Sequence, residues 1–128
     1  MLDIEPVRKD AEQELRVPSI WRGTLAEIVE AFRDGDYCLQ RRIIPGVSKI
    51  DERTAEIIAG NIAYYPCVLA SLPPETWKTS VYLWMEDYWE VIVDLYSVDT
   101  GCTDLILDVR VYEEPTSYRF DVQLVYVP

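Results

Sequence analysis

The sequence predicts an α+β domain in which two N-terminal helices pack on one face of a mostly antiparallel meander sheet of about four to five strands. Apolar residues recur at helical spacing up to Pro66 and then switch to the alternation that is typical of strands. Turn residues separate the alternating segments, which favours a meander. At 128 residues the chain is long enough to build one hydrophobic core.

The first helix is predicted to begin at Ser19 and to end before Gly35. Ser19 follows a proline and is a suitable N-cap, and glycine is the residue that most often closes a helix. The apolar residues of this segment form a single helical stripe, which consists of Trp21, Leu25, Ile28, Val29 and Phe32.

A second helix is predicted after residue 51. Asp51 is a suitable N-cap and Pro66 stops the helix. Its apolar stripe consists of Ala55, Ile58, Ala59, Ile62 and Tyr65. Residues 36–50 are predicted as a connector that contains one short strand before Pro45-Gly46.

Two long strands can be aligned by their apolar alternation. The inward-facing sets are Trp89, Val91, Val93 and Leu95 on one strand and Leu105, Leu107, Val109 and Val111 on the next. Residues 99–101 suit a three-residue loop with glycine in the left-handed position, which pairs Val98 with Cys102. This register sets Leu95 opposite Leu105, Val93 opposite Leu107 and Val91 opposite Val109. On the reverse face it places Glu90 opposite Arg110.

The last strand follows a loop at residues 114–117. This loop places Asp121 opposite Arg110 and sends three apolar residues to the core, namely Phe120, Val122 and Leu124. Arg110 is therefore expected to stand between two carboxylates, within hydrogen-bonding contact of Glu90, Asp121 or both.

Two segments remain less defined. Residues 77–87 end in Glu86-Asp87, which fits either a tight turn or a continuous, bulged strand, because neither residue is a typical turn former. Residues 1–17 interleave acids and bases with few large apolar groups and are predicted to form a loosely ordered tail or a poorly anchored helix. Residues 18–128 are predicted to form the single domain.

The net charge of −11 is concentrated at the C-terminal end of the chain. Residues 86–128 hold ten acids against two bases, whereas residues 1–85 hold thirteen acids against ten bases. This charge repels nucleic acids and acidic membranes and attracts a basic protein partner.

Several classes of catalytic site are missing from the composition. The chain has no histidine, which removes the commonest general base and the Ser-His-Asp and Cys-His systems, and its five glycines are isolated. Its three cysteines, Cys38, Cys67 and Cys102, form no metal or redox motif and suit a reducing compartment. Because the chain has no long apolar run and no secretion signal, we expect a cytoplasmic protein. Because these catalytic motifs are missing, we expect that it is not an enzyme and holds no cofactor or metal.

The candidate binding surface is the reverse face of the predicted meander. Its carboxylates can steer and pair with a cationic partner, and its tyrosines can supply contact area. The predicted site residues are Tyr88, Glu90, Asp94, Tyr96, Asp108, Arg110, Tyr112 and Asp121. Strand propensity alone also accounts for such a face.

Three other interpretations stay open. Asp94, Asp104 and Asp108 could form an acid–base or metal cluster. A ligand pocket could lie between the helices and the sheet, as in cone-shaped α+β domains that bind small ligands or act as lyases, lined by Trp77, Trp84, Trp89, Tyr64, Tyr65 and Tyr82. The same outer face could also mediate symmetric self-association.

Three segments, WRGTLAEIV, DYWEVIVDLYS and VQLVYVP, resemble a family of small bacterial proteins of unknown function. The resemblance covers residues 20–128 and implies a bacterial cytoplasmic setting, with no catalytic residues to transfer. In general character the chain is also similar to bacterial immunity proteins, which neutralise basic toxins. The leading hypothesis is therefore a protein-binding, immunity-like or regulatory module, and the alternative is a domain with an aromatic-lined ligand pocket.

Overall fold

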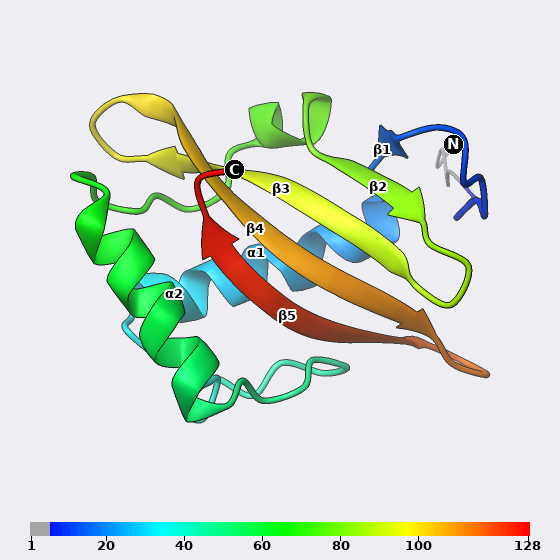
Figure 1. Cartoon of the computed structure of the whole chain (residues 1–128), viewed down its shortest axis with the longest axis horizontal. Coiled ribbons are helices and arrows are strands. Elements are labelled where there is room, and N and C mark those ends of the chain that lie inside the picture. The colour runs from blue at the N-terminus through cyan, green and yellow to red at the C-terminus, as the bar shows by residue number, and fades with distance from the viewer. Residues whose placement is uncertain (1–5) are drawn as a thin grey trace.

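The computed structural model describes residues 6–128 and confirms the α+β prediction. Five strands form one antiparallel sheet in sequence order (Figure 1): β1 (Leu15–Arg16), β2 (Val81–Trp84), β3 (Trp89–Ser97), β4 (Gly101–Glu113) and β5 (Tyr118–Tyr126). Helix α1 (Ser19–Arg33) crosses behind the sheet, and α2 (Glu52–Tyr64) lies along the β5 edge. A short 3₁₀ helix, η1 (Pro74–Lys78), precedes β2.

Helix α1 packs the predicted stripe into the core. Trp21, Leu25 and Ile28 are fully buried. The N-cap is Pro18 rather than the predicted Ser19, because the proline provides the extended residue (φ −66°, ψ 145°) and its carbonyl accepts from the backbone N–H of Trp21. Gly35 has φ +77° and ends the helix as predicted.

Helix α2 begins as predicted, at an aspartate cap. The Asp51 carboxylate accepts a hydrogen bond from the Thr54 backbone N–H at 2.8 Å, which lowers the pKa of Asp51. Its buried residues, Ala55, Ile58 and Ile62, join the same core.

The connector between the helices contains no strand within the described residues 36–50, which corrects the prediction of one. The chain instead folds around the buried carboxylate of Asp36, which accepts from the backbone N–H groups of Gln40, Arg41 and Arg42. Farther along, Gly46 and Ser48 bond to the backbone of Phe120, so the connector covers part of the β5 edge.

The predicted register of β3 and β4 is correct in the middle of the strands and wrong at the hairpin end. Glu90 pairs with Arg110, and the predicted pairs Val91–Val109 and Val93–Leu107 form. Beyond a bulge after Asp94, Tyr96 pairs with Cys102, and Val98 lies in the loop instead of pairing. The predicted pair of Leu95 with Leu105 does not form; instead, the buried hydroxyl of Thr103 lies between them, donating to the Leu95 carbonyl and accepting from the Leu105 backbone N–H.

The predicted pairing of Arg110 with Asp121 across β4 and β5 also forms, but a bulge then shifts the register. Val109 pairs with Val122 and Asp108 pairs with Leu124, so Gln123 is the extra residue on β5. The shift sends Val125 into the core, where it is fully buried. Leu124 pairs with Asp108 on the outer-face side but still packs partly against the core, so its predicted place in the core is only partly correct.

The residues before α1 form more structure than the sequence indicated. Leu15 and Arg16 pair with β2, and the Val17 side chain is fully buried. The backbone carbonyl of Arg8 accepts a hydrogen bond from Trp89 Nε1 at 3.0 Å, and Lys9 forms an ion pair with Glu113. Residues 1–5 of the predicted tail lie outside the described residues.

The uncertain segment before β3 is a hairpin turn. Trp84 pairs with Trp89, and the Met85 backbone N–H donates to the Tyr88 carbonyl at 2.8 Å. Glu86 takes the left-handed conformation (φ 79°) that the turn requires. Of the two predicted possibilities, the tight turn is therefore the one that forms.

Candidate functional site

The outer face of the sheet is the face opposite α1, and neither helix covers it (Figure 1). Most of its side chains are half-buried among their own neighbours, whereas Ile106 is buried and Asp104 is exposed. Its members are Tyr88, Glu90, Ile92, Asp94 and Tyr96 from the β3 region, Asp104, Ile106, Asp108, Arg110 and Tyr112 from β4, and Arg119, Asp121, Leu124 and Tyr126 from β5. All eight predicted site residues thus lie on this face.

Strand pairing arranges these residues in rows across β3, β4 and β5. The rows are Glu90–Arg110–Asp121, Ile92–Asp108–Leu124 and Asp94–Ile106–Tyr126. Tyr112 pairs with Arg119 at one end of the face, and Tyr96 lies opposite Cys102 at the other end. Leu124 and Tyr126 were not predicted on this face, because the alternating pattern of the sequence gives no sign of the β5 bulge that shifts the register.

Arg110 stands between Glu90 and Asp121 in the register, as predicted, but it forms an ion pair with neither of them. Its guanidinium lies over the Tyr88 ring, 4.6 Å from the ring centroid, and its Nε is buried without a hydrogen-bond partner. A tyrosine face next to Arg110 supplies a cation–π contact that competes with the carboxylates. The predicted ion pairs of Arg110 are therefore wrong, although its register is correct.

The two tyrosines at this end are covered by arginines of the same chain. The rings of Tyr88 and Tyr112 lie 5.6 Å apart, and the Arg119 guanidinium lies 4.4 Å from the centroid of Tyr112. These four side chains, Arg110, Tyr88, Tyr112 and Arg119, form one stacked group. The carboxylate-rich part of the outer face lies beyond it.

Two of the predicted carboxylates already have intramolecular partners. Asp121 accepts from the Ser48 hydroxyl at 2.6 Å and lies 3.4 Å from Arg119 Nε. Asp94 accepts from the Thr79 hydroxyl. Both serve to hold neighbouring segments against the sheet.

Asp108 has a different environment at the centre of the face. Its cross-strand neighbours are Ile92 and Leu124, and its Oδ1 atom is buried without a hydrogen-bond partner. Burial, together with the nearby charge of Glu90, raises the pKa of Asp108 from its ordinary 3.8 to about 6, against the opposing effect of Arg110. No hydrogen bond or ion pair connects Asp108 or the Glu90 side chain to another side chain among residues 6–128.

The other interpretations find less structural support. No three acidic, histidine or cysteine side chains of the described chain come together in a metal-binding arrangement. Asp94, one of the three candidate ligands, is bonded to Thr79.

The tryptophan-lined pocket would require a cavity beside Trp84 or Trp89. Trp21 instead fills this region, with its ring 5.4 Å from that of Trp89 and 5.2 Å from that of Tyr82, both edge-on. Cavities of about 230 to 590 Å³ among residues 6–128 include one beside Tyr64 and Tyr65 and one beside Tyr82, but Trp77, Trp84 and Trp89 line none of these.

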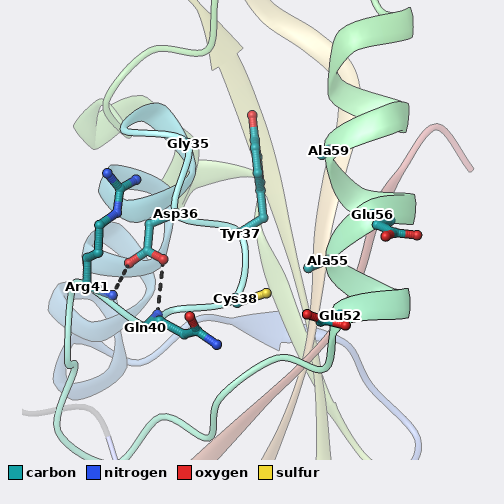
Figure 2. A pocket seen from close by; sticks show the side chains of 10 residues that line it. All are labelled: Gly35, Asp36, Tyr37, Cys38, Gln40, Arg41, Glu52, Ala55, Glu56 and Ala59. Carbon is teal, nitrogen blue, oxygen red and sulfur yellow. Dashed lines mark hydrogen bonds between the residues drawn. The ribbon is translucent and has the colours of Figure 1, made fainter.

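A shallow groove of about 500 Å³ lies elsewhere, between α2 and the Asp36 loop (Figure 2). Ala55 and Ala59 leave space on the helix side, and Tyr37 and Cys38 form the opposite wall. The Asp36 carboxylate is directed at its own loop, and its hydrogen bonds to the backbone N–H groups of Gln40 and Arg41 are visible in Figure 2. Its role in the loop is thus structural.

The fold and the outer face define a small α+β meander domain with an open, acidic, tyrosine-bearing sheet. The chain belongs to a family described as a domain of unknown function, DUF7668, whose model matches residues 29–128. The match begins within α1, so β1 and the first turns of α1 precede it. No curated protein and no solved structure matches the chain significantly. Across residues 6–128, no helix has both the length and the apolar character needed to cross a bilayer.

Proposed function

We propose that this protein is a non-enzymatic binding module that engages a basic protein partner through the outer face of its sheet. The observation that carries the proposal is the ionisable but poorly solvated carboxylate of Asp108 at the centre of an uncovered sheet face. A carboxylate that lacks hydrogen bonds gains more from a cation than a solvated carboxylate does, because less water has to be displaced.

The charges and apolar groups of the outer face also favour a protein partner. Ile92 and Leu124, both half-buried, provide apolar area at the centre above the buried Ile106, and acids surround them. The two arginines of the face, Arg110 and Arg119, are stacked on tyrosines. Charged residues around an apolar centre are the usual anatomy of a transient protein interface.

The setting is part of the proposal. We place the protein in the bacterial cytoplasm, where an acidic module of this size would act as an immunity-like or regulatory protein against a basic partner. Neither a nucleic acid nor a membrane is proposed as a ligand, because both are anionic and the chain carries a net charge of −11.

Affinity capture at low and high salt tests this proposal. The immobilised chain is compared with an Asp94→Lys/Asp108→Lys variant and with a control, Glu52→Lys/Glu56→Lys, that makes the same charge change on α2. We expect the wild type and the control to retain a basic protein at about 50 mM salt and to lose it at high salt, and the outer-face variant to retain none. Equal capture by all three proteins would refute the proposal.

A further inference from the structure

We infer that the partner is anchored by one arginine side chain, whose guanidinium binds Asp108 and Glu90 within the apolar surround of Ile92, Ile106 and Leu124. This inference rests on the proposed function and adds the chemistry of the anchor to it.

Two acids of the outer face already have intramolecular partners. Asp121 is bonded to Ser48 and Arg119, and Asp94 is bonded to Thr79. A partner that displaced these contacts would have to break them first. The exposed Asp104, toward the hairpin end of β4, has no side-chain hydrogen bond or ion pair within residues 6–128, but it is solvated and away from the apolar centre of the face. Asp108 and Glu90 lie on adjacent strands, one row apart, and have no such contacts within residues 6–128.

The carboxylate of Asp108 is poorly solvated. Its Oδ1 is buried and unbonded, whereas its Oδ2, which also has no hydrogen bond, is not among the buried atoms. One oxygen of the carboxylate is thus shielded from water without a hydrogen bond, and the other can be reached from outside. Such a group is destabilised when ionised, and a cation at Oδ2 relieves that cost.

The positive charge of Arg110 acts on Asp108 and opposes the rise of its pKa, but no ion pair forms between the two side chains within residues 6–128. Arg110 is two residues from Asp108 on the same strand, but its guanidinium lies on the Tyr88 ring. Arg119 lies on Tyr112 and contacts Asp121 and Glu114. The two arginines of the outer face are therefore held at one end, and the place beside Asp108 is left to a partner.

The chemistry of the site favours an arginine of the partner over a lysine. A guanidinium is planar, carries several donors in a fixed arrangement and is more weakly hydrated than an ammonium. It can bond Asp108 and Glu90 at once while its faces contact Ile92 and Leu124. A lysine would lose more hydration in the same surroundings, so arginine is the favoured anchor.

This geometry links binding to pH. The groups that face Asp108 are Glu90 and Asp94 from β3, Arg110 from β4, and Asp121 from the next row of β5. Because the pKa of Asp108 is about 6, binding of the cation should weaken as the pH falls through 6 and Asp108 takes up a proton.

Carboxyl-detected NMR with a defined probe tests the inference. The probe is a blocked arginine tripeptide, with the matched lysine tripeptide as comparison, titrated at pH 7.5 into wild type, Asp108→Asn and the control Asp121→Asn. We expect the Asp108 and Glu90 carboxyl resonances to move, affinity to fall about tenfold in Asp108→Asn and less than about twofold in Asp121→Asn, and the lysine peptide to bind more weakly.

Two outcomes separate this inference from the proposed function. If the arginine peptide moves amide resonances on the outer face but binds Asp108→Asn as well as it binds wild type, the assignment of Asp108 as the anchor is refuted, and the outer face is kept as the binding surface. If the peptide instead moves resonances on α2 or the Asp36 loop, both the anchor and the outer-face surface are refuted. Equal binding of the two peptides would overturn the assignment of arginine.

Discussion

The guanidinium of Arg110 lies 4.6 Å from the centre of the Tyr88 ring, close to the end of the sheet where β2 turns into β3. A stacked arginine keeps its charge but gives up the ion pairs that its strand position offers. Asp108, at the centre of the outer face, therefore feels the charge of Arg110 but has no direct ion pair with it, and its Oδ1 atom is buried without a hydrogen bond. The outer face thus carries carboxylate charge that its own arginines do not pair with directly.

Replacing Asp108 by asparagine should stabilise the fold at neutral pH. The folded state raises the pKa of Asp108 from 3.8 to about 6, so the ionised side chain destabilises the fold above pH 6 and stops doing so below about pH 4. After allowance for its partial exposure, we expect Asp108→Asn to raise the free energy of unfolding by about 1 kcal/mol at pH 7.5 and to have no effect near pH 4. Denaturant titrations at both pH values measure this.

The control for that experiment is Asp104→Asn, an exposed aspartate on the same strand and face. It should stay within about 0.5 kcal/mol of wild type. A loss of stability in Asp108→Asn at pH 7.5 would contradict the environment described for this carboxylate.

Two glycines should respond to alanine with opposite signs. Gly46 has φ +78°, and a Cβ there would lie 2.9 Å from the Tyr118 carbonyl oxygen. Gly23 is an exposed position of α1, where a Cβ would meet no side chain or distant backbone atom within 4 Å. Gly46→Ala should lower the free energy of unfolding by about 1–3 kcal/mol, and Gly23→Ala should raise it by about 0.5–1 kcal/mol. Thermal unfolding of both variants checks the pair, and a shift of the same sign in both would be inconsistent with it.

The Asp36 loop should depend on its buried carboxylate. Burial opposes ionisation of Asp36, but hydrogen bonds from the backbone N–H groups of Arg42, Gln40 and Arg41 outweigh it and lower the pKa of Asp36 below 3.8. We expect Asp36→Ala to cost about 2–4 kcal/mol, because three N–H groups lose their acceptor.

The pH dependence of that loss has a defined sign. Because the pKa of Asp36 is lowered on folding, its contribution is complete above the ordinary value and is lost as the pH falls through the lowered one. Wild type and Asp36→Ala should therefore converge in acid. The partial replacement Asp36→Asn, which keeps one acceptor oxygen, should fall between them in chemical denaturation at pH 7.

The hairpin between β3 and β4 should depend on the hydroxyl of Thr103. Thr103→Val removes the donor to the Leu95 carbonyl and the acceptor of the Leu105 backbone N–H, with almost no change of shape. Two buried backbone groups lose their partners, so we expect a cost of about 2–3 kcal/mol. Faster amide hydrogen exchange at Leu105 is the diagnostic readout. Thr116→Val, in an exposed loop, should change neither quantity.

The sequence was sufficient wherever local chemistry and alternation agreed. The Asp51 cap, the α1 stripe and the pairing of Glu90 with Arg110 all formed as predicted. These features depend on spacing, which a single sequence displays directly.

The remaining features depend on contacts between distant residues. The β5 bulge that turns Leu124 outward places one extra residue in a strand whose alternation looks regular. The two-residue strand Leu15–Arg16 is too short to show an alternating pattern in the sequence, and it forms by pairing with the free edge of β2. The stacking of Arg110 was missed because register fixes which residues are opposite, but not which neighbour a long side chain selects.

The most direct test of the proposed binding surface is amide chemical-shift mapping of the protein with the basic protein that it captures. We expect the changes to lie on the outer faces of β3, β4 and β5, with Asp108 and Glu90 at their centre. Changes confined to α2 and the Asp36 loop, with the outer face unaffected, would contradict the account.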